Sequence, residues 1–139
     1  MNRDGGIMEE TRFKGKLLRC PVEVTLKVIG GKYKPILLYV LDEHGVLRFG
    51  ELRRLVPQAS KKMLTQQLRE LESDGLLDRK VFHQVPPKVE YSLSRRGKSL
   101  EPILTEMGAW GKKYAAIYEK EEPLPPRSRS KNALRYVGR

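Results

Sequence analysis

Residues 60–93 read SKKMLTQQLRELESDGLLDRKVFHQVPPKVEYSL, and this stretch decides the fold. It opens on a serine whose hydroxyl can cap a helix, and Gly75 suits the left-handed position at which a helix ends. Beyond the glycine, residues 89–93 alternate cleanly between apolar and polar side chains, and residues 77–85 do so less regularly. The two prolines between these segments lack the N–H that a central strand needs, so they mark a projecting turn. The stretch therefore predicts a helix followed by a two-stranded β-hairpin.

The predicted helix has two chemically distinct faces. Leu64, Leu68 and Leu71 recur at spacings of four and three, which places them on one stripe. Basic and amide residues with the same spacings lie two positions away, roughly 200° around the helix axis, and so face outward. Lysine and arginine attract phosphate, and arginine and glutamine form bidentate hydrogen bonds with guanine and adenine edges. The candidate base-reading residues are Lys62, Thr65, Gln66 and Arg69.

The pattern of this helix alone does not distinguish a DNA-reading helix from an ordinary amphipathic helix with a solvated charged face. The segments that precede it favour the first interpretation. A first helix begins at Pro21, which suits a helix start, and stops at Gly30. A second helix is predicted over 35–43, and a third begins at Phe49 and is closed by Pro57. Only two residues separate that proline from the next helix cap, so two helices meet across a tight turn. This is a helix-turn-helix arrangement.

A long final helix is predicted after Ser94, which can cap its start. From Leu100 to Ile117, apolar residues recur at steps of three and four, an a/d pattern that demands burial against another helix. Pro102 lies within this helix and should kink or interrupt its first turns. A lone domain rarely hides such a stripe, so we expect a dimer interface here, with some residues also packing inside their own subunit. The candidate dimer residues are Leu100, Ile103, Met107, Trp110 and Tyr114.

Three segments divide the chain, whose length is normal for one domain. Residues 1–19 form a polar arm that we expect to be flexible, and they lack the continuous apolar segment of a secretory signal. We expect residues 20–118 to form the folded DNA-binding and dimerisation domain. Residues 119–139 have little to bury and are predicted to be a disordered basic tail.

Composition narrows the class of partner. The 139 residues carry a formal net charge of +11, so the surface field concentrates polyanions, of which nucleic acid is the foremost. No apolar run is long enough to span a bilayer, so we expect no membrane partner, and the single cysteine fits a reducing cytoplasm. The sequence has two histidines, no metal-ligand spacing and no phosphate-binding glycine loop. We therefore expect no enzyme activity and no cofactor or metal.

Five blocks of sequence carry a family resemblance. They are, in order, CPVEVTLKVIGGKYKPILLYVL, RFGELRRLVP, SKKMLTQQLRELESDGLL, VPPKVEYSLSRRGKSL and AWG, and together they cover residues 20–111. Their order and spacing resemble those of the HxlR-type winged helix-turn-helix regulators, bacterial transcription factors with a MarR-like fold that bind operator DNA as homodimers. Two departures are Tyr33, where the family usually has tryptophan, and Ala59, where a larger aliphatic residue is common.

The resemblance implies an α+β, mainly α fold, with three to four helices, a two-stranded β-hairpin wing and a long C-terminal dimerisation helix. It also implies a homodimer on an inverted-repeat operator in double-stranded DNA, joined through the first and last helices. We interpret the chain as a repressor, because it shows no domain for contacting polymerase. The alternative is a winged helix that binds RNA or another protein. The residues expected to contact phosphate are Arg53, Arg54, Ser60, Lys61, Arg79, Lys80 and Lys88.

Cys20 has two readings. It precedes the first predicted helix, where amide dipoles and the neighbouring Arg19 favour a thiolate. Some HxlR-type proteins resemble thiol sensors through a cysteine at the matching position, which implies an oxidant or small-molecule effector. Because the chain has no second cysteine, oxidation would give a mixed or intersubunit disulfide, and an electrophile would give an adduct. The equal alternative is a small residue that packs in the dimer interface.

Overall fold

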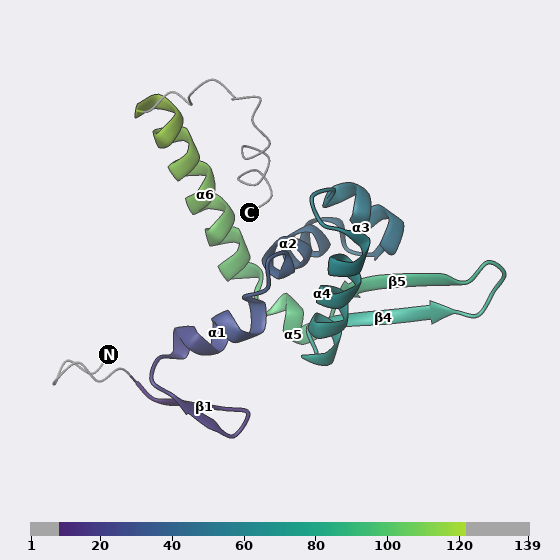
Figure 1. Cartoon of the computed structure of the whole chain (residues 1–139), viewed down its shortest axis with the longest axis horizontal. Coiled ribbons are helices and arrows are strands. Elements are labelled where there is room, and N and C mark those ends of the chain that lie inside the picture. Colours follow the sequence, from purple (N-terminus) through teal and green to yellow (C-terminus); the bar gives the residue numbers. More distant parts are fainter. Residues whose placement is uncertain (1–8, 122–139) are drawn as a thin grey trace.

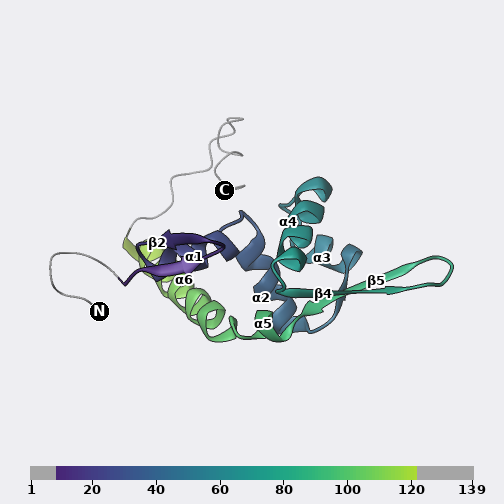
Figure 2. The same ribbon diagram turned by 90° about the horizontal axis from the view of Figure 1, so that it is seen from below.

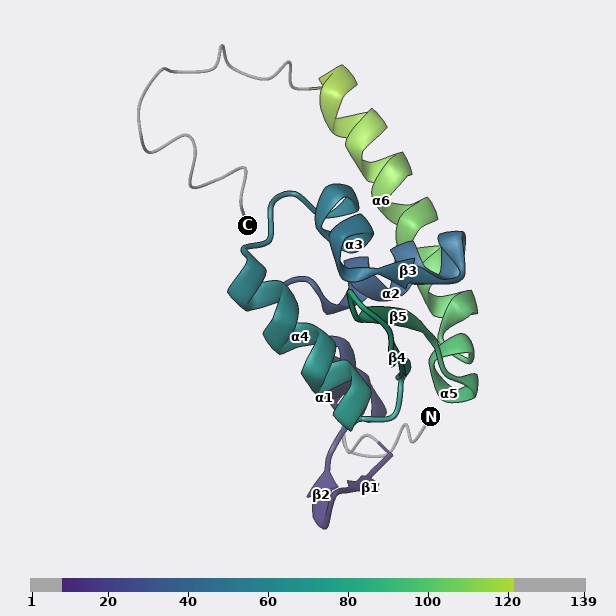
Figure 3. The same cartoon turned by 90° about the vertical axis from the view of Figure 1, so that its right-hand side faces the viewer.

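The computed structural model describes residues 9–121, in which the helices α2, α3 and α4 form a core that carries a projecting hairpin and a long last helix (Figure 1). The mainly helical α+β class predicted from the sequence is confirmed. Helices α4 and α6 lie on different sides of α2 (Figure 3). The elements, in chain order, are β1 (Thr11–Phe13), β2 (Lys16–Leu18), α1 (Pro21–Ile29), α2 (Lys34–His44), β3 (Leu47–Arg48), α3 (Phe49–Leu55), α4 (Lys61–Ser73), β4 (Leu77–Phe82), β5 (Lys88–Leu93), α5 (Arg95–Lys98) and α6 (Glu101–Glu121).

Helix α4 begins and ends where the sequence predicts. Ser60 Oγ accepts a hydrogen bond from the Met63 N–H at 3.1 Å, so the serine caps the helix. At the other end Gly75 has a φ of 76°, and the Leu76 N–H donates to the Leu71 carbonyl at 2.9 Å. This is a Schellman ending, which satisfies carbonyls that the last turn would otherwise leave unpaired.

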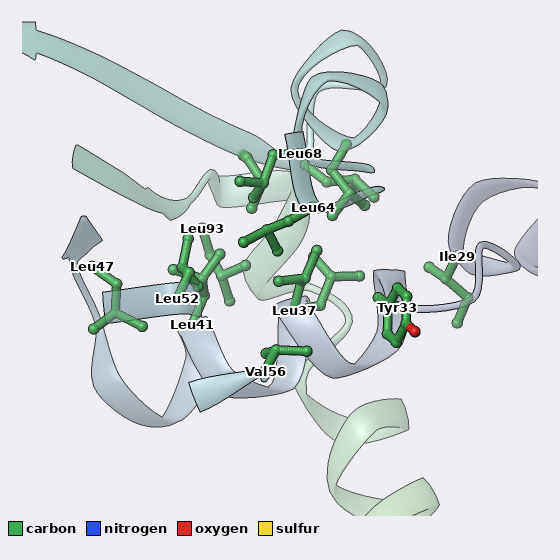
Figure 4. Close-up of a cluster of buried hydrophobic side chains, with 14 of the residues drawn as sticks. Ile29, Tyr33, Leu37, Leu41, Leu47, Leu52, Val56, Leu64, Leu68 and Leu93 are labelled. Atoms are coloured by element: carbon green, nitrogen blue, oxygen red, sulfur yellow. The ribbon is translucent and has the colours of Figure 1, made fainter. Parts of the chain in front are cut away.

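The hydrophobic core lies between α2, α3 and α4 (Figure 4). The three leucines predicted to face inward from α4, Leu64, Leu68 and Leu71, are 0%, 1% and 0% exposed. Their burial fixes which side of α4 faces solvent, because the opposite face then carries the basic and amide residues. The other fully buried core residues are Leu37, Leu38, Leu41, Leu52, Val56 and Leu104.

The wing is a sheet of three strands in the order β3-β5-β4, with antiparallel neighbours. The sequence predicts the β4-β5 hairpin, which projects from the core in Figure 2. The third strand, β3, lies between the second and third predicted helices, and its Leu47 pairs with Tyr91. Strand β4 ends at Phe82, opposite Lys88, so it is shorter than the predicted strand and residues 83–87 form the turn. A two-residue strand is too short for its periodicity to be seen in the sequence.

Residues 11–18 form a hairpin, where the sequence predicts a flexible arm. Strands β1 and β2 pair antiparallel across Lys14 and Gly15, whose φ angles of 49° and 75° suit a tight hairpin turn. Leu18 is buried, and both strands contact α1. Lys14 Nζ lies 2.9 Å from Asp74 Oδ1 at the end of α4. The hairpin therefore joins the start of α1 to the C-terminal end of α4.

The predicted final helix is divided into α5 and α6. Ser94 Oγ accepts a backbone N–H at 3.0 Å and caps the short helix α5. Pro102 lies in the first turn of α6, where a proline is tolerated, so the interruption expected near it is confirmed. Helix α6 continues past Tyr118 through Glu121, into the segment predicted to be disordered. The rest of that predicted tail, residues 122–139, lies outside the described residues.

Candidate nucleic-acid interface

The outward face of α4 brings together the residues predicted to read bases. Lys62, Gln66 and Arg69 are exposed on this face, which is hollowed into one open surface depression. Thr65 is half-buried, and its hydroxyl donates to the Lys61 carbonyl at 2.8 Å, so its hydroxyl hydrogen is already used. The face thus presents several long donor side chains on a helix that the core holds in place. The residues that line the depression are Lys61, Lys62, Thr65, Gln66, Arg69 and Glu70.

A second basic site lies beside the start of α4. Arg53 and Arg54 are exposed on α3, and they line another open depression together with Pro57 and Ala59. Ala59 is buried in the turn between the two helices. The first N–H groups of a helix attract anions, and Ser60 uses its side chain to satisfy one of those of α4. The predicted phosphate contacts of α3 therefore lie near the positive end of α4.

Arg79 joins the wing to α4. Its Nε lies 3.0 Å from Glu72 Oε2, and both side chains are partly exposed, so this ion pair adds little stability. Tyr91 lies close to this pair, and burial raises the pKa of its phenol, with Arg79 opposing the rise and Glu72 adding to it. The Tyr91 phenol therefore stays neutral at physiological pH. Only the remaining N–H groups of Arg79 are available to a phosphate.

Two lysines of the wing share one aromatic ring. Lys80 Nζ lies 4.9 Å and Lys88 Nζ 4.4 Å from the centroid of the Phe82 ring, within the range of cation–π contacts. Lys88 is the first residue after the turn, near the tip of the wing as predicted, and its Nζ also lies 3.1 Å from Glu90 Oε1. The charge of Lys88 is therefore partly neutralised within the wing.

Two buried polar side chains support α4 on its inward side, and neither was predicted from the sequence. Gln67 is 7% exposed, and its Oε1 accepts the Tyr33 N–H at 2.9 Å. Lys34 is also 7% exposed, and its Nζ lies 2.7 Å from Glu70 Oε2. The signal for Gln67 was present in the sequence: it lies inside the leucine stripe, where a polar residue must find a buried partner.

Tyr33, the departure from the family's usual tryptophan, has a polar role as well as an apolar one. Its ring is buried in the core, and its hydroxyl donates to the Gln58 carbonyl at 3.0 Å. Gln58 lies in the turn between α3 and α4. The α1–α2 connection is thus tied both to this turn and, through Gln67, to the middle of α4.

Glu70 lies at the edge of the outward face of α4. The Lys34 ammonium lowers the pKa of the Glu70 carboxyl, through a hydrogen bond and then through its charge, and Gln66 lowers it further. Glu70 is therefore ionised at neutral pH. Because its pKa is lower in the folded state, its contribution to stability is present above the unfolded pKa and is lost as the pH falls through the folded one.

The apolar stripe of α6 faces solvent. All the predicted dimer residues except Leu100 are between 43% and 67% exposed. Trp110 and Tyr114 stack with their ring centroids 5.1 Å apart, and Tyr114 continues the stack to Tyr118 at 6.4 Å. Leu100 instead packs against the core of its own subunit, and Leu104, at 2% exposure, anchors α6 there. The predicted stripe omits Leu104 because that residue lies beside the heptad positions rather than on them.

Cys20 occupies the N-cap position of α1 in an extended conformation, with a φ of −142°. Its carbonyl accepts the Glu23 N–H at 2.9 Å, and the residue is half-buried. On the helix that follows, Val22 and Leu26 are each 60% exposed. The cysteine therefore lies next to a second uncovered apolar face.

Within residues 9–121, no group of three or more His, Cys, Asp or Glu side chains is placed to hold a metal ion. Over the same residues, the helices are too short or too polar for any of them to cross a membrane.

The helix-turn-helix and its wing match a known family. The model of the HxlR-like helix-turn-helix family matches residues 28–119, which include α2 to α5, the wing and nearly all of α6. The chain belongs to this family. The resemblance in the five sequence blocks is thereby confirmed.

The relatives of this HxlR-like chain are transcriptional regulators. YdeP of Bacillus subtilis (strain 168), an uncharacterized HTH-type transcriptional regulator, is 55% identical over 103 residues, which are 74% of this chain and 80% of YdeP. The redox regulator HypR in its oxidized form is 57% identical with a TM-score of 0.65, covering 68% of this chain and 96% of HypR. A MarR-family regulator from Porphyromonas gingivalis W83 is 31% identical with a TM-score of 0.64, covering 75% of this chain and 97% of that one. None of the three is named as an enzyme, and the HxlR-like chain is a regulator of transcription by family.

Proposed function

We propose that this chain binds double-stranded operator DNA as a homodimer and represses transcription in the cytoplasm. The observation that carries the proposal is the outward face of α4, on which Lys62, Gln66 and Arg69 lie opposite the buried leucines. The major groove of B-DNA admits an α-helix, and arginine and glutamine can form bidentate contacts there. Each subunit would place α4 in one major groove, with its N-terminal end foremost.

Basic residues around α4 would position it on the phosphate backbone. Arg53, Arg54 and Lys61 are exposed near the start of α4, and Lys80 lies on the wing. Phosphate contacts fix orientation without reading sequence, and the net charge of +11 favours them. Arg79 and Lys88 are expected to contribute less, because each already has a carboxylate partner.

The uncovered apolar faces of α6 and α1 support the homodimer. Trp110 and Tyr114 on α6, and Val22 and Leu26 on α1, are all more than half exposed. Contiguous apolar faces of this kind usually mark contact surfaces. A symmetric pair would bind DNA at two half-sites related by a two-fold axis, with centres roughly 34 Å apart or a multiple of that distance.

Selection from a random duplex library tests the proposal. We expect the chain to recover an inverted repeat with this spacing. The Arg69→Ala variant should lose preference at one position of each half-site, at a cost of about 1–3 kcal/mol. The matched Arg54→Ala variant should keep the motif, bind all sequences more weakly and reduce the salt dependence by about one phosphate contact.

The alternative class predicts a different result. A winged helix that binds RNA or a protein would recover no motif from duplex DNA. The deep, narrow major groove of an RNA helix cannot admit α4, so a matched RNA duplex should compete poorly with the recovered operator. Equal binding to both duplexes would contradict the DNA-reading function.

We also propose that Cys20 makes the regulator responsive to oxidants or electrophiles. The thiol is half-buried at the start of α1 beside an uncovered apolar face, and the similar protein HypR is a redox regulator with a solved oxidized form. An oxidant such as diamide would take two electrons and two protons from two thiols, and the disulfide would join Cys20 to its copy or to a small thiol. Modification should change operator affinity by about 5–150-fold, the usual range of coupling between sites.

The Cys20→Ser variant isolates the contribution of the thiol. Operator affinity should be measured by titration with and without diamide, for the wild type and for the variant. We expect the wild type to respond and the variant to be unaffected. If both respond alike the sensor role fails, and if neither responds Cys20 is a packing residue.

A further inference from the structure

Three side chains connect the buried start of α2 to a base-reading residue. Lys34 Nζ lies 2.7 Å from Glu70 Oε2, and the Lys34 side chain is only 9% exposed. The other carboxylate oxygen, Glu70 Oε1, accepts a hydrogen bond from Gln66 Nε2 at 3.4 Å. Lys34 and Gln66 therefore bind opposite oxygens of one carboxylate.

The position of Lys34 is set by the core. It is the first residue of α2, and a Cβ on Gly31 would lie 2.8 Å from its Cγ and Cδ, so the glycine leaves room for its stem. The buried ammonium has little freedom to move, and Glu70 is consequently held against the side of α4. Glu70 itself is more open, with a side-chain exposure of 44%, and it borders the depression on the outward face.

The charge of Glu70 decides how the Gln66 amide is turned. The two ends of a glutamine amide have nearly the same shape, and only hydrogen-bond partners distinguish them. An ionised carboxylate accepts hydrogen bonds and donates none, so the NH₂ end of Gln66 must face Glu70. The Gln66 Oε1 and the second N–H are then left for another partner. Adenine offers the matching groups in the major groove, an N6–H₂ donor and an N7 acceptor.

We propose that Glu70, held by Lys34, fixes the amide orientation of Gln66 and so makes Gln66 a reader of adenine. Glu70 and Lys34 are then positioning residues for base recognition, and Gln66 is the specificity-determining one. This inference rests on the proposed DNA-binding function. Without Glu70 the Gln66 amide would rotate freely. Binding to adenine would then cost the entropy of ordering the side chain, and the amide would often be turned with its NH₂ and Oε1 ends exchanged.

The test compares full-length variants on the operator that the wild type selects. With Glu70→Gln the side chain at position 70 can donate as well as accept, so the orientation of Gln66 is no longer fixed. We expect roughly a three- to tenfold loss of discrimination at one adenine in each half-site, the scale of ordering one side chain. Preferences at the other positions should stay unchanged. Lys34→Met, which keeps the apolar stem, should give a loss at the same position.

Two further measurements separate positioning from general support. Glu72→Gln is the matched control, because it removes another ion-paired carboxylate from the same helix that does not contact Gln66, and it should leave the adenine preference intact. In a double-mutant cycle, Glu70→Gln should have no effect at that position once Gln66→Ala is present. Melting temperatures of all variants show whether any of them loses its fold.

Each other outcome overturns the inference. Uniform weakening at every base position would show that Lys34 and Glu70 only support the helix. A changed preference at a cytosine that persists in the Gln66→Ala background would show that Glu70 reads a base itself. A wild type without base preference would overturn both this inference and the proposed function. A wild type that selects an inverted repeat, with adenine discrimination unaffected by Glu70→Gln, would overturn this inference alone.

Discussion

Trp110→Glu should separate the two subunits and remove most of the affinity for the operator. Trp110 is 67% exposed on the stripe of α6, stacked on Tyr114, and we propose that a second copy covers it. A carboxylate at this position would lie in an apolar contact without a partner, which is costly. A monomer binds only one half-site at a time. Its affinity for the operator should therefore be lower by about 10²- to 10⁴-fold, the usual contribution of a linked second site. Sedimentation velocity and operator titration measure the two effects.

Ala116→Glu is the matched control for this experiment. Ala116 is exposed on the same helix and lies roughly 120° from Trp110 and roughly 160° from Tyr114 about the helix axis. The variant introduces the same negative charge as Trp110→Glu does. This variant should stay dimeric and bind the operator as the wild type does. If Trp110→Glu remained a dimer with full affinity, α6 would not form the dimer contact.

Leu64→Ala should be the most destabilising of the single changes discussed. Leu64 is 0% exposed in the middle of the core, on the inner side of α4. Removing most of its side chain loses burial and leaves a cavity, at a cost of about 2–5 kcal/mol. For a domain of this size each kcal/mol lowers the melting temperature by roughly 4–8 °C. Denaturant and thermal unfolding followed by circular dichroism measure the loss.

Lys62→Ala provides the comparison on the other side of the same helix. Lys62 is exposed, so its truncation should change stability by no more than about 0.5 kcal/mol while operator binding weakens. The two variants should therefore separate: one loses stability and the other loses affinity. Equal stability losses would mean that the inward and outward faces of α4 have been misassigned.

The sequence predicts α4 well because its structure is set locally. Its leucine spacing, its Ser60 cap and its Gly75 ending lie within a short stretch, and the structure confirms all of them. The turn before α4 was predictable for the same reason, since Pro57 lies so close to that cap. The outward residues followed directly from the inward ones, because a helix that buries one stripe must expose the opposite one.

The features that the sequence did not reveal depend on contacts between distant segments. Gln67 and Tyr33 are 34 positions apart, and neither identity alone indicates that one binds the backbone of the other. Lys34 looks like an ordinary surface charge until α2 is packed against α4. Strand β3 and the β1-β2 hairpin are too short to give a periodic pattern. The homodimer, the DNA contacts and the role of Cys20 stay predictions.

The buried amide of Gln67 has a consequence for engineering. A designer could replace α4 by a helix from another protein, or replace Gln67 by leucine to make the apolar stripe continuous. Either change would remove the acceptor of the Tyr33 N–H. Such an orphaned buried donor costs about 1–3 kcal/mol. Variants that recognise new DNA sequences should therefore be made by substituting the outward-facing side chains of α4 one at a time, while Gln67 is retained.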